Sequence, residues 1–416
     1  MHIPNWKTQL IKDVCEEIFS GGTPSTKEKK YWDGDIFWLS SGEIKSRYIC
    51  NTERKITQLG VDNSSTRLAK KGDTLVASAG QGNTRGNSAL SKVNTYINQS
   101  IIALRPDKQK IDAKFLFFNL TNRYSELRNL SDSNSSRGSL TCKLIENLPI
   151  NLPPLPTQRK IAAILSAYDN LIENNTRRIK ILEEMAQAIY REWFVHFRFP
   201  GHEGVRMVES ELGMIPEGWE VRKLGDIAEE VRKSVDPNNL DPNTPYVGLE
   251  HVPRKSIALT DWGLAEEVQS TKHQFFIKEI LFGKIRPYFH KVVVAPIDGI
   301  CSSDAIVIRP IKAEFFALVL FCVSSEDFVN HATQTSQGTK MPRANWNVLV
   351  NYSVVIPPKS LLEEFNRIVF DIVDIIITKI FQNNNLRRTR DLLLPKLISG
   401  ELDVSELDIE IPEKNA

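Results

Sequence analysis

The chain has 416 residues, of which 41% are hydrophobic and 25% are charged, the composition of an ordinary globular protein. At roughly 150 residues per domain, this length predicts two to three domains, each large enough to bury its own core. Lysine and arginine number 53 against 51 aspartate and glutamate, so the net charge of +2 gives no general attraction to nucleic acid. A nucleic-acid surface would have to come from local segregation of charge.

The sequence shows no membrane segment and no secretory signal. The apolar run at 372–377 is short and contains Asp374, whereas a membrane span needs about 18 apolar residues. The N-terminus has no basic region followed by an apolar stretch. The five cysteines include no CxxC pair, which is typical of incidental thiols in a reducing compartment. We therefore expect a cytoplasmic protein.

The chain repeats itself at an interval slightly above 200 residues. Trp6 and the segment 13–18 correspond to Trp219 and the segment 226–231. Further along, 73–77 matches 279–283, 102–106 matches 306–310, and 150–154 matches 354–358. This interval is far too long for a solenoid unit, so it indicates duplication of a whole domain together with the segment after it.

Each copy consists of short β-branched and aromatic runs between loops rich in glycine, serine and asparagine, which predicts strands. A Pro-Pro step ends each copy, at Pro153 and Pro357, because proline cannot continue a strand ladder. We expect an α+β protein with two pseudo-repeated mixed α/β domains separated by two long helices in an antiparallel intramolecular coiled coil. The expected boundaries are domains at 1–156 and 216–358, helices at 157–198 and 359–402, a linker at 199–215 and an acidic tail at 403–416.

Both helices show the 3.5-residue repeat of a coiled-coil seam. In the first helix the seam positions are Ile161, Leu165, Tyr168, Ile172, Asn175, Ile179, Leu182, Ala186, Ile189 and Trp193. Adding 204 gives the second seam, which has more polar positions: Phe365, Val369, Ile372, Ile376, Lys379, Asn383, Leu386, Arg390, Leu393 and Leu397.

An antiparallel pairing of Ile161 with Leu397 places Asn175 opposite Asn383 and Ile179 opposite Lys379. A buried amide pair costs stability but fixes register. Two separate helices, each packed on its own domain, are the alternative. At ~1.5 Å per residue, the seam from Ile161 to Trp193 makes a rod of about 50 Å. Such a rod can hold two domains about one to two turns of B-DNA apart, at ~34 Å per turn, and would act as a ruler.

The combination of repeat, proline step and long helices resembles the specificity subunits of type I restriction–modification enzymes, over nearly the whole chain. Three strings carry the resemblance: 182–201 at the end of the first helix, 215–221 at the start of the second domain, and 390–402 near the end of the chain. One departure is that 155–158, Leu-Pro-Thr-Gln, becomes 359–362, Lys-Ser-Leu-Leu, in the second copy.

The resemblance implies a chain that is not itself an enzyme and that reads a bipartite, asymmetric site in double-stranded DNA. One target recognition domain would read each half. Separate modification subunits would dock on the helices, bind S-adenosylmethionine and methylate adenine. Restriction (motor-nuclease) subunits would cut unmodified DNA with ATP and Mg²⁺, and no cofactor or metal is expected on this chain.

Four loops without acidic residues lie at equivalent places in the two copies, at 77–95, 133–143, 283–294 and 334–346. Arginine and lysine can bind phosphates or the guanine edge, and asparagine and glutamine suit adenine. The alternative is that each loop is an ordinary solvated turn. The candidate DNA-contacting residues are Gln81, Asn83, Thr84, Arg85, Asn87, Arg137, Lys143, Lys284, Arg286, Tyr288, His290, Lys291, Gln337, Lys340, Arg343 and Asn345.

No motif for catalysis is convincing. The glycine-rich segment 80–86 lacks GxGxxG spacing. The segment around Asp107 and Asp112 imitates a nuclease motif, but its spacing is short and the second copy has Pro310-Ile311-Lys312 in place of Pro106-Asp107. His196 and His202 flank a linker without a metal-ligand cluster, and 151–155 does not match an amino-methyltransferase motif. Two alternatives remain open, a self-contained methyltransferase or nuclease with an unfamiliar active site, and a coiled-coil scaffold that binds only protein.

Overall fold

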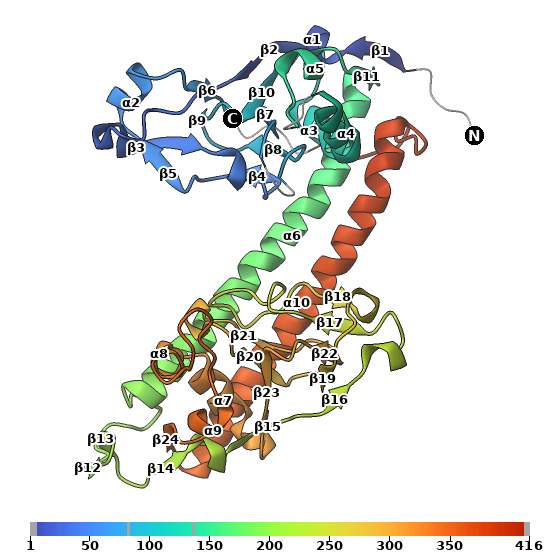
Figure 1. The fold of residues 1–416 in the computed structure, drawn as a ribbon. Helices are drawn as coiled ribbons and strands as arrows, with labels where there is room; N and C mark the ends of the chain where they lie inside the picture. The colour runs from blue at the N-terminus through green and yellow to red at the C-terminus, as the bar shows by residue number, and fades with distance from the viewer. Residues whose placement is uncertain (1–5, 81–83, 135–137, 412–416) are drawn as a thin grey trace. The chain divides into compact units, whose positions relative to one another are not determined.

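The computed structural model describes residues 6–80, 84–134 and 138–411 (Figure 1). The chain divides into two compact units, which are treated separately. Unit 1 comprises residues 1–171 and 386–416, and unit 2 comprises residues 172–385. Two long helices, α6 (Leu155–Tyr190) and α10 (Lys359–Ser399), each contribute one end to each unit. Each unit is therefore one copy of the repeat together with the nearer ends of both helices.

Unit 1 is built on a five-stranded sheet of order β2-β10-β7-β8-β4 and a four-stranded sheet of order β5-β3-β9-β6, and β1 pairs with β11. Its core is formed by α3, with Phe115, Phe117 and Phe118 fully buried, and by the helix residues Leu165 and Leu397. The strands are β1 (Lys7–Leu10), β2 (Cys15–Ser20), β3 (Trp32–Leu39), β4 (Tyr48–Ile49), β5 (Arg54–Ile56), β6 (Arg67–Ala69), β7 (Thr74–Ala77), β8 (Ser88–Ser91), β9 (Thr95–Ile97), β10 (Ile101–Pro106) and β11 (Pro149–Leu152), and the shorter helices are α1 (Ile11–Val14), α2 (Gln58–Asp62), α3 (Ala113–Asn122), α4 (Tyr124–Asn134) and α5 (Cys142–Glu146).

Unit 2 repeats this plan, with sheets of order β15-β23-β20-β21 and β16-β19-β22-β17-β18, and β14 paired with β24. The predicted linker 199–215 contains a hairpin, β12–β13, that the sequence did not suggest. The strands are β12 (Met207–Ser210), β13 (Gly213–Pro216), β14 (Glu220–Lys223), β15 (Ala228–Glu230), β16 (Ser234–Val235), β17 (Pro245–Val247), β18 (Gly263–Leu264), β19 (Lys272–Phe275), β20 (Ile280–Gly283), β21 (Val292–Val294), β22 (Gly299–Cys301), β23 (Ala305–Pro310) and β24 (Ser353–Ile356), and the shorter helices are α7 (Phe316–Val323), α8 (Glu326–Gln334) and α9 (Trp346–Leu349).

The duplication extends to strand register. In unit 1, Ala77 pairs with Ile101, and in unit 2 the corresponding Gly283 pairs with Ala305. An ion pair with a buried carboxylate, at the end of this ladder, is also repeated. Arg105 Nη2 lies 3.0 Å from Asp73 Oδ2, and Arg309 Nε lies 2.6 Å from Glu279 Oε1.

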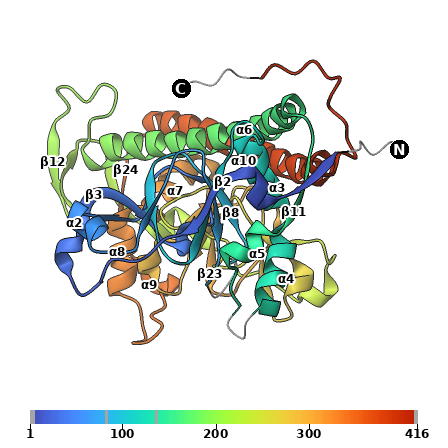
Figure 2. The same ribbon diagram turned by 90° about the horizontal axis from the view of Figure 1, so that it is seen from above.

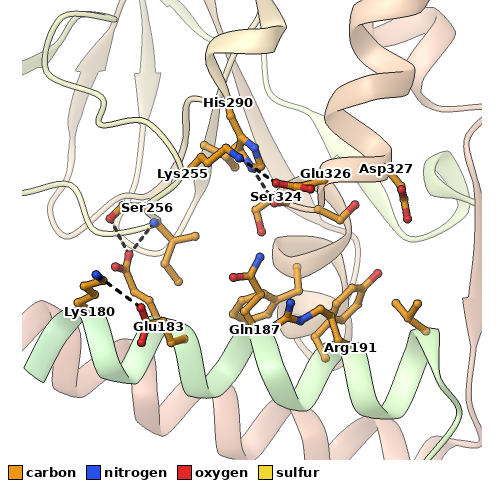
Figure 3. A pocket seen from close by; sticks show the side chains of 17 residues that line it. Lys180, Glu183, Gln187, Arg191, Lys255, Ser256, His290, Ser324, Glu326 and Asp327 are labelled. Atoms are coloured by element: carbon orange, nitrogen blue, oxygen red, sulfur yellow. Dashed lines mark hydrogen bonds and ion pairs between the residues drawn. The ribbon is translucent and has the colours of Figure 1, made fainter. Parts of the chain in front are cut away.

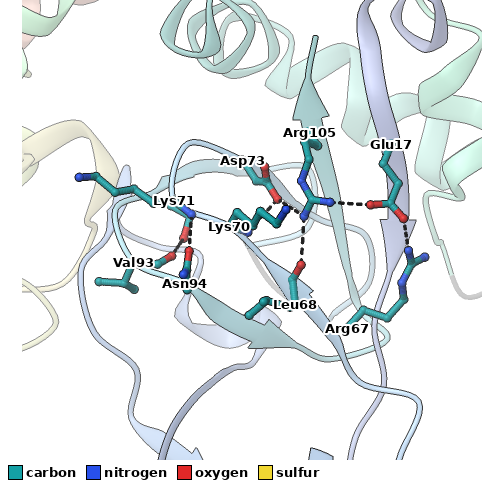
Figure 4. A network of polar contacts seen from close by, with 10 residues as sticks. Glu17, Arg67, Leu68, Lys70, Lys71, Asp73, Val93, Asn94 and Arg105 are labelled. Carbon is teal, nitrogen blue, oxygen red and sulfur yellow. Dashed lines mark hydrogen bonds and ion pairs between the residues drawn. The ribbon is translucent and has the colours of Figure 1, made fainter. Parts of the chain in front are cut away.

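Figure 4 shows that Arg105 also binds Glu17, at 2.6 Å, and that Glu17 in turn pairs with Arg67. Burial raises the pKa of Asp73, and hydrogen bonds from the Lys70 backbone and from Arg105 oppose that rise. The buried carboxylate is thus held by charge-assisted hydrogen bonds.

Within each unit, the segments of the two long helices run antiparallel and side by side (Figures 1 and 2), joined by Asp169–Arg390 in unit 1 and Asn175–Asn383 in unit 2. Asn175 Nδ2 donates to Asn383 Oδ1 at 3.1 Å within unit 2, which is the pair that the seam register predicts. Asn383 Nδ2 also lies 3.3 Å from Thr176 Oγ1. Both amides are buried, so the polar layer is hydrogen-bonded rather than orphaned.

The prediction that Lys379 lies in the coiled-coil seam is wrong. Its ammonium is exposed and donates to Gln382 Oε1 at 3.0 Å, whereas the next residue, Ile380, is only 2% exposed. The seam therefore advances by four residues twice, from Ile372 to Ile376 and on to Ile380, before it returns to Asn383. An unpaired ammonium in the seam would lose its hydration without compensation, and a neighbouring isoleucine avoids that cost.

Local sequence accounts for the helix ends. Helix α6 begins at Leu155 with Pro156 in its first turn, where proline costs no hydrogen bond. It ends in a π-helical turn, Arg191–Val195, that buries Trp193 and Phe194. Helix α10 ends before Gly400, whose φ of 80° is the left-handed conformation that glycine favours at this position.

Within the described residues, no single helix is long and apolar enough to cross a membrane. The two stretches Ala313–Val323 and Glu326–Gln334 meet that criterion only as a pair bent by 67°.

Candidate nucleic-acid interface

The two predicted loops of the first copy come together in unit 1. The backbone N–H of Leu140 donates to the carbonyl of Ser78 at 2.8 Å, which joins the segment after α4 to the β7–β8 connection. Arg85 from that connection donates to the Gly138 carbonyl at 3.1 Å and forms an ion pair with Asp132. The Arg85 guanidinium is therefore mostly buried in a contact between the two loops.

The two loops of the second copy meet in the same way in unit 2. The N–H of Ala344 donates to the carbonyl of Lys284 at 2.9 Å, and these residues correspond to Leu140 and Ser78. The N–H of Arg286 donates to the Pro342 carbonyl at 2.7 Å, so a second bond fastens the loops. Each unit thus has one loop pair, and the two pairs lie on corresponding strands of the repeated fold.

A tight turn, Pro287–Phe289, dominates the loop pair of unit 2. It lies between two non-glycine residues in the left-handed region, Arg286 at φ 49° and His290 at φ 51°. Such strain persists only where the surroundings hold it. His290 Nε2 is 2.8 Å from the Ser324 carbonyl, and the His290 carbonyl accepts from the N–H of Lys255 at 2.8 Å. This anchored turn presents Tyr288, which is 51% exposed.

The other candidate residues of unit 2 divide by exposure. Gln337, Lys340, Arg343 and Asn345 are exposed. Arg343 Nε lies 3.7 Å from Asp304 Oδ1, and the Asn345 side chain caps α9. Lys291 is partly buried and donates to the Leu249 carbonyl, and its pKa is lowered first by burial and then by Arg254.

The remaining candidates of unit 1 are less prominent. Lys143 is exposed on α5, Thr84 is half-buried, and Asn87 Nδ2 donates to the Ile44 carbonyl at 3.2 Å. Gln81, Asn83 and Arg137 lie outside the described residues. The assignment of all these candidates to DNA contact stays a prediction.

Two features of these loops could not be foreseen from the sequence. The loops are free of acids along the chain, but Asp132 in unit 1 and Asp304 in unit 2 reach their arginines from outside the loop segments. Arg254 and Lys255 join the loop pair of unit 2, with the Arg254 guanidinium 4.1 Å from the centre of the Phe289 ring. Lys255 has a φ of 55°, a strain that spacing along the sequence does not reveal.

A hollow beside α6 in unit 2 has mixed charge (Figure 3). Lys180, Arg191 and Lys255 line it together with Glu326 and Asp327. Lys255 is paired with Glu326 at 2.8 Å, so no single charge sign dominates the hollow. In the described part of the chain, no group of three or more histidine, cysteine or acidic residues could hold a metal ion.

Comparison with known proteins gives a consistent result. A family model described as "Type I restriction modification DNA specificity domain" matches residues 4–184 and 216–388. The type I restriction enzyme MjaIX specificity subunit of Methanocaldococcus jannaschii is 29% identical, over 97% of this chain and 95% of that protein. The EcoDI specificity subunit of Escherichia coli is 26% identical, over 89% and 87%. A solved S subunit from M. genitalium aligns with a TM-score of 0.60 at 15% identity, over 95% of this chain and 98% of that one, which indicates a shared fold.

Proposed function

The chain belongs to the family of type I restriction–modification DNA specificity domains, and from that premise we propose that it is the specificity subunit of a type I restriction–modification complex. It reads a bipartite, asymmetric site in double-stranded DNA, one half with each loop pair. The observation that carries this proposal is a repeated backbone hydrogen bond, from the N–H of Leu140 to the Ser78 carbonyl and from the N–H of Ala344 to the Lys284 carbonyl. It supports one loop pair on corresponding strands of each unit.

The exposed cations of unit 2 suit such a role. Lys340 and Arg343 lie on the surface around the Tyr288 turn, where arginine and lysine can bind phosphates or the guanine edge. Gln337 and Asn345 supply amides suited to adenine. In unit 1 the proposed surface includes Lys143, and the assignment of Gln81, Asn83 and Arg137 to DNA contact stays a prediction from the sequence.

We propose that the chain performs no catalysis itself. Modification subunits would bind the long helices, where Ile181 and Met185 on α6 are about half exposed. S-adenosylmethionine would bind to those subunits, and ATP with Mg²⁺ to restriction subunits. Exposed apolar side chains one helical turn apart favour a protein partner over solvent. The proposal includes a cytoplasmic location, consistent with five free cysteines.

The helices also supply the proposed ruler. The 36 residues of α6 form a helix of about 50 Å at ~1.5 Å per residue. We propose that this length sets the number of base pairs between the half-sites.

The decisive experiment maps methylated adenines in the genome of cells that express this chain with its modification and restriction subunits. We expect one split sequence with a fixed spacer to be methylated. Methylation at a continuous short site, or methylation independent of this chain, contradicts the proposal. Methyl transfer by the purified chain alone would instead support the alternative of a self-contained methyltransferase.

Binding to duplex DNA provides the second test. Affinity of the complex should fall steeply with salt, because phosphate contacts release counterions. A complex that does not bind duplex DNA at low salt would support the alternative of a scaffold that binds only protein.

A further inference from the structure

Each unit contains one carboxylate from α6 that receives several hydrogen bonds from the globular part of the same unit. The residues are Asp169 in unit 1 and Glu183 in unit 2. They are 14 residues apart, two full heptads, so they occupy the same position in the coiled-coil repeat. Neither was among the seam residues that the sequence predicts.

Asp169 uses both carboxylate oxygens. Oδ2 accepts from the Tyr48 hydroxyl at 2.7 Å and from Arg47 Nε at 3.3 Å, and Oδ1 accepts from Arg390 Nη1 at 2.7 Å. The side chain is only 2% exposed. Asp169 therefore ties strand β4 to both long helices within unit 1.

The charges around Asp169 depend on it. Burial lowers the pKa of Arg47, against the attraction of Asp169. Arg390 also pairs with Asp391 at 2.8 Å, and its pairing with the two carboxylates outweighs burial and raises its pKa. Loss of the Asp169 charge would leave two largely buried guanidinium groups with one exposed carboxylate between them, a costly arrangement.

Glu183 uses a single oxygen. Its Oε1 accepts from the Ser256 hydroxyl at 2.7 Å, a bond that Figure 3 shows. The same oxygen accepts from the backbone N–H groups of Ile257 at 2.7 Å and Ala258 at 3.0 Å. Because all three donors meet one oxygen, a glutamine at this position would keep them.

The two carboxylates hold equivalent places in the repeated fold. Tyr48 pairs in parallel with Leu90 of β8, and Ala258 forms a parallel bridge with Val294 of β21. Strands β8 and β21 correspond, and each leaves the loop pair of its unit. Each carboxylate therefore binds the segment beside the strand that carries the loops.

We propose that Asp169 and Glu183 are positioning residues that fix the orientation of each loop pair on α6 and thereby restrict the spacer length at which the two half-sites are read. This inference rests on the proposed function. The contacts differ between the units. Asp169 binds two arginines and a tyrosine in unit 1, whereas Glu183 binds a serine and two backbone N–H groups in unit 2.

The test uses the full chain assembled with its modification subunits. Duplexes carry the two mapped half-sites with the natural spacer, or with one base pair more or fewer. We expect the unaltered complex to methylate the natural spacer about tenfold faster than either neighbour, and Asp169→Asn and Glu183→Ala to reduce that preference to about threefold or less, with base preferences in each half-site unchanged.

Conservative and control variants sharpen the test. Glu183→Gln should keep the spacer preference, because Oε1 remains an acceptor, whereas Asp169→Asn should lose it, because an amide places N–H groups against arginine. Glu173→Gln and Glu184→Gln alter exposed carboxylates on the same helix and should behave as the unaltered chain. If Asp169→Asn does not fold, Tyr48→Phe removes one donor without changing the charge balance.

Three results separate the possibilities. Equal loss at all three spacers, with a lower melting temperature, means that these residues are merely structural and overturns the inference. If Glu183→Gln reduces the spacer preference as much as Glu183→Ala does, the proposed role of Oε1 as an acceptor is overturned. An unaltered complex that methylates no split site contradicts the proposed function instead, before any variant is compared.

Discussion

The loop pair of unit 1 and the loop pair of unit 2 share a scaffold but present different chemistry. The same backbone hydrogen bond joins the loops in both. In unit 1 the loop arginine, Arg85, is only 8% exposed and is bound to Asp132, whereas in unit 2 the turn at Arg286 holds Tyr288 in solvent. A duplicated frame has thus acquired two unlike surfaces, which is what an asymmetric DNA site would require.

The largest expected effect on this comparison comes from the loop glycines. Gly138 has a φ of 61°, and a Cβ there would overlap Arg85 Nη1. We expect Gly138→Ala to destabilise unit 1 by about 2–4 kcal/mol, because left-handed strain adds to displacement of the arginine. In unit 2, Gly338 has φ 99°, and a Cβ there would meet the Met341 carbonyl at 3.4 Å and Pro342 Cα at 3.9 Å without overlap, so Gly338→Ala should cost about 1–2 kcal/mol. Urea unfolding, monitored by hydrogen exchange in each unit, measures the destabilisation caused by each variant. Equal losses of unfolding free energy in the two units would contradict the predicted difference.

Arginine replacements come next. Arg286→Ala should weaken binding to the second half-site by about 1–3 kcal/mol, with the first half-site unaffected. Arg85→Ala should instead lower the free energy of unfolding of unit 1 by about 1–3 kcal/mol, because the Gly138 carbonyl and Asp132 lose their partner. Gel shifts on duplexes with one half-site scrambled, together with melting curves, distinguish these outcomes. Arg222→Ala, on the exposed face of β14, is the control and should change neither quantity.

The exposed ring of Tyr288 gives a smaller effect. Tyr288→Ala should cost about 0.5–1.5 kcal/mol of binding at the second half-site, and the stability of unit 2 should stay the same because the ring is half in solvent. Tyr288→Phe separates the ring from the hydroxyl. A loss of stability without any loss of binding would mean that the ring serves only the turn.

The smallest effect concerns pH. Burial raises the pKa of Glu183, although hydrogen bonds from Ser256 and the 257–258 backbone oppose the shift. A carboxyl whose pKa is higher in the folded state stabilises the fold below its unfolded pKa and loses that contribution as pH rises through the folded value. The stability of the unaltered chain relative to Glu183→Gln should therefore fall as the pH rises from about 4.5, the ordinary pKa of glutamate. A difference that is constant with pH would contradict the shift.

Much of the fold can be predicted from sequence because the signals are local or periodic. The repeat, the two helices and the Asn175–Asn383 pair are all visible as spacing along the chain. Lys379 was misplaced because a strict 3.5 repeat cannot show where the helix takes two steps of four, to Ile380. The hairpin in the linker was missed because its strands are short and lack alternation.

The candidate site was harder to predict because its decisive contacts join distant residues. Arg85 and Asp132 are 47 residues apart, and Asp169 and Arg390 are 221 apart. Loop composition indicated where cations gather but not which of them are neutralised. Backbone strain at Arg286 and His290 arises from tertiary contacts, which no local pattern records.

The division of the chain between the units has a consequence for its synthesis. Unit 2 is continuous, but unit 1 needs residues from 386 onward, and Leu394 and Leu397 join the core that contains Ile161 and Leu165. During synthesis the core of unit 1 can therefore be completed only after α10 has been made, and part of its apolar surface stays uncovered until then, whereas unit 2 already has all of its residues. Of the two units, the one whose synthesis begins first is the one whose core is completed last.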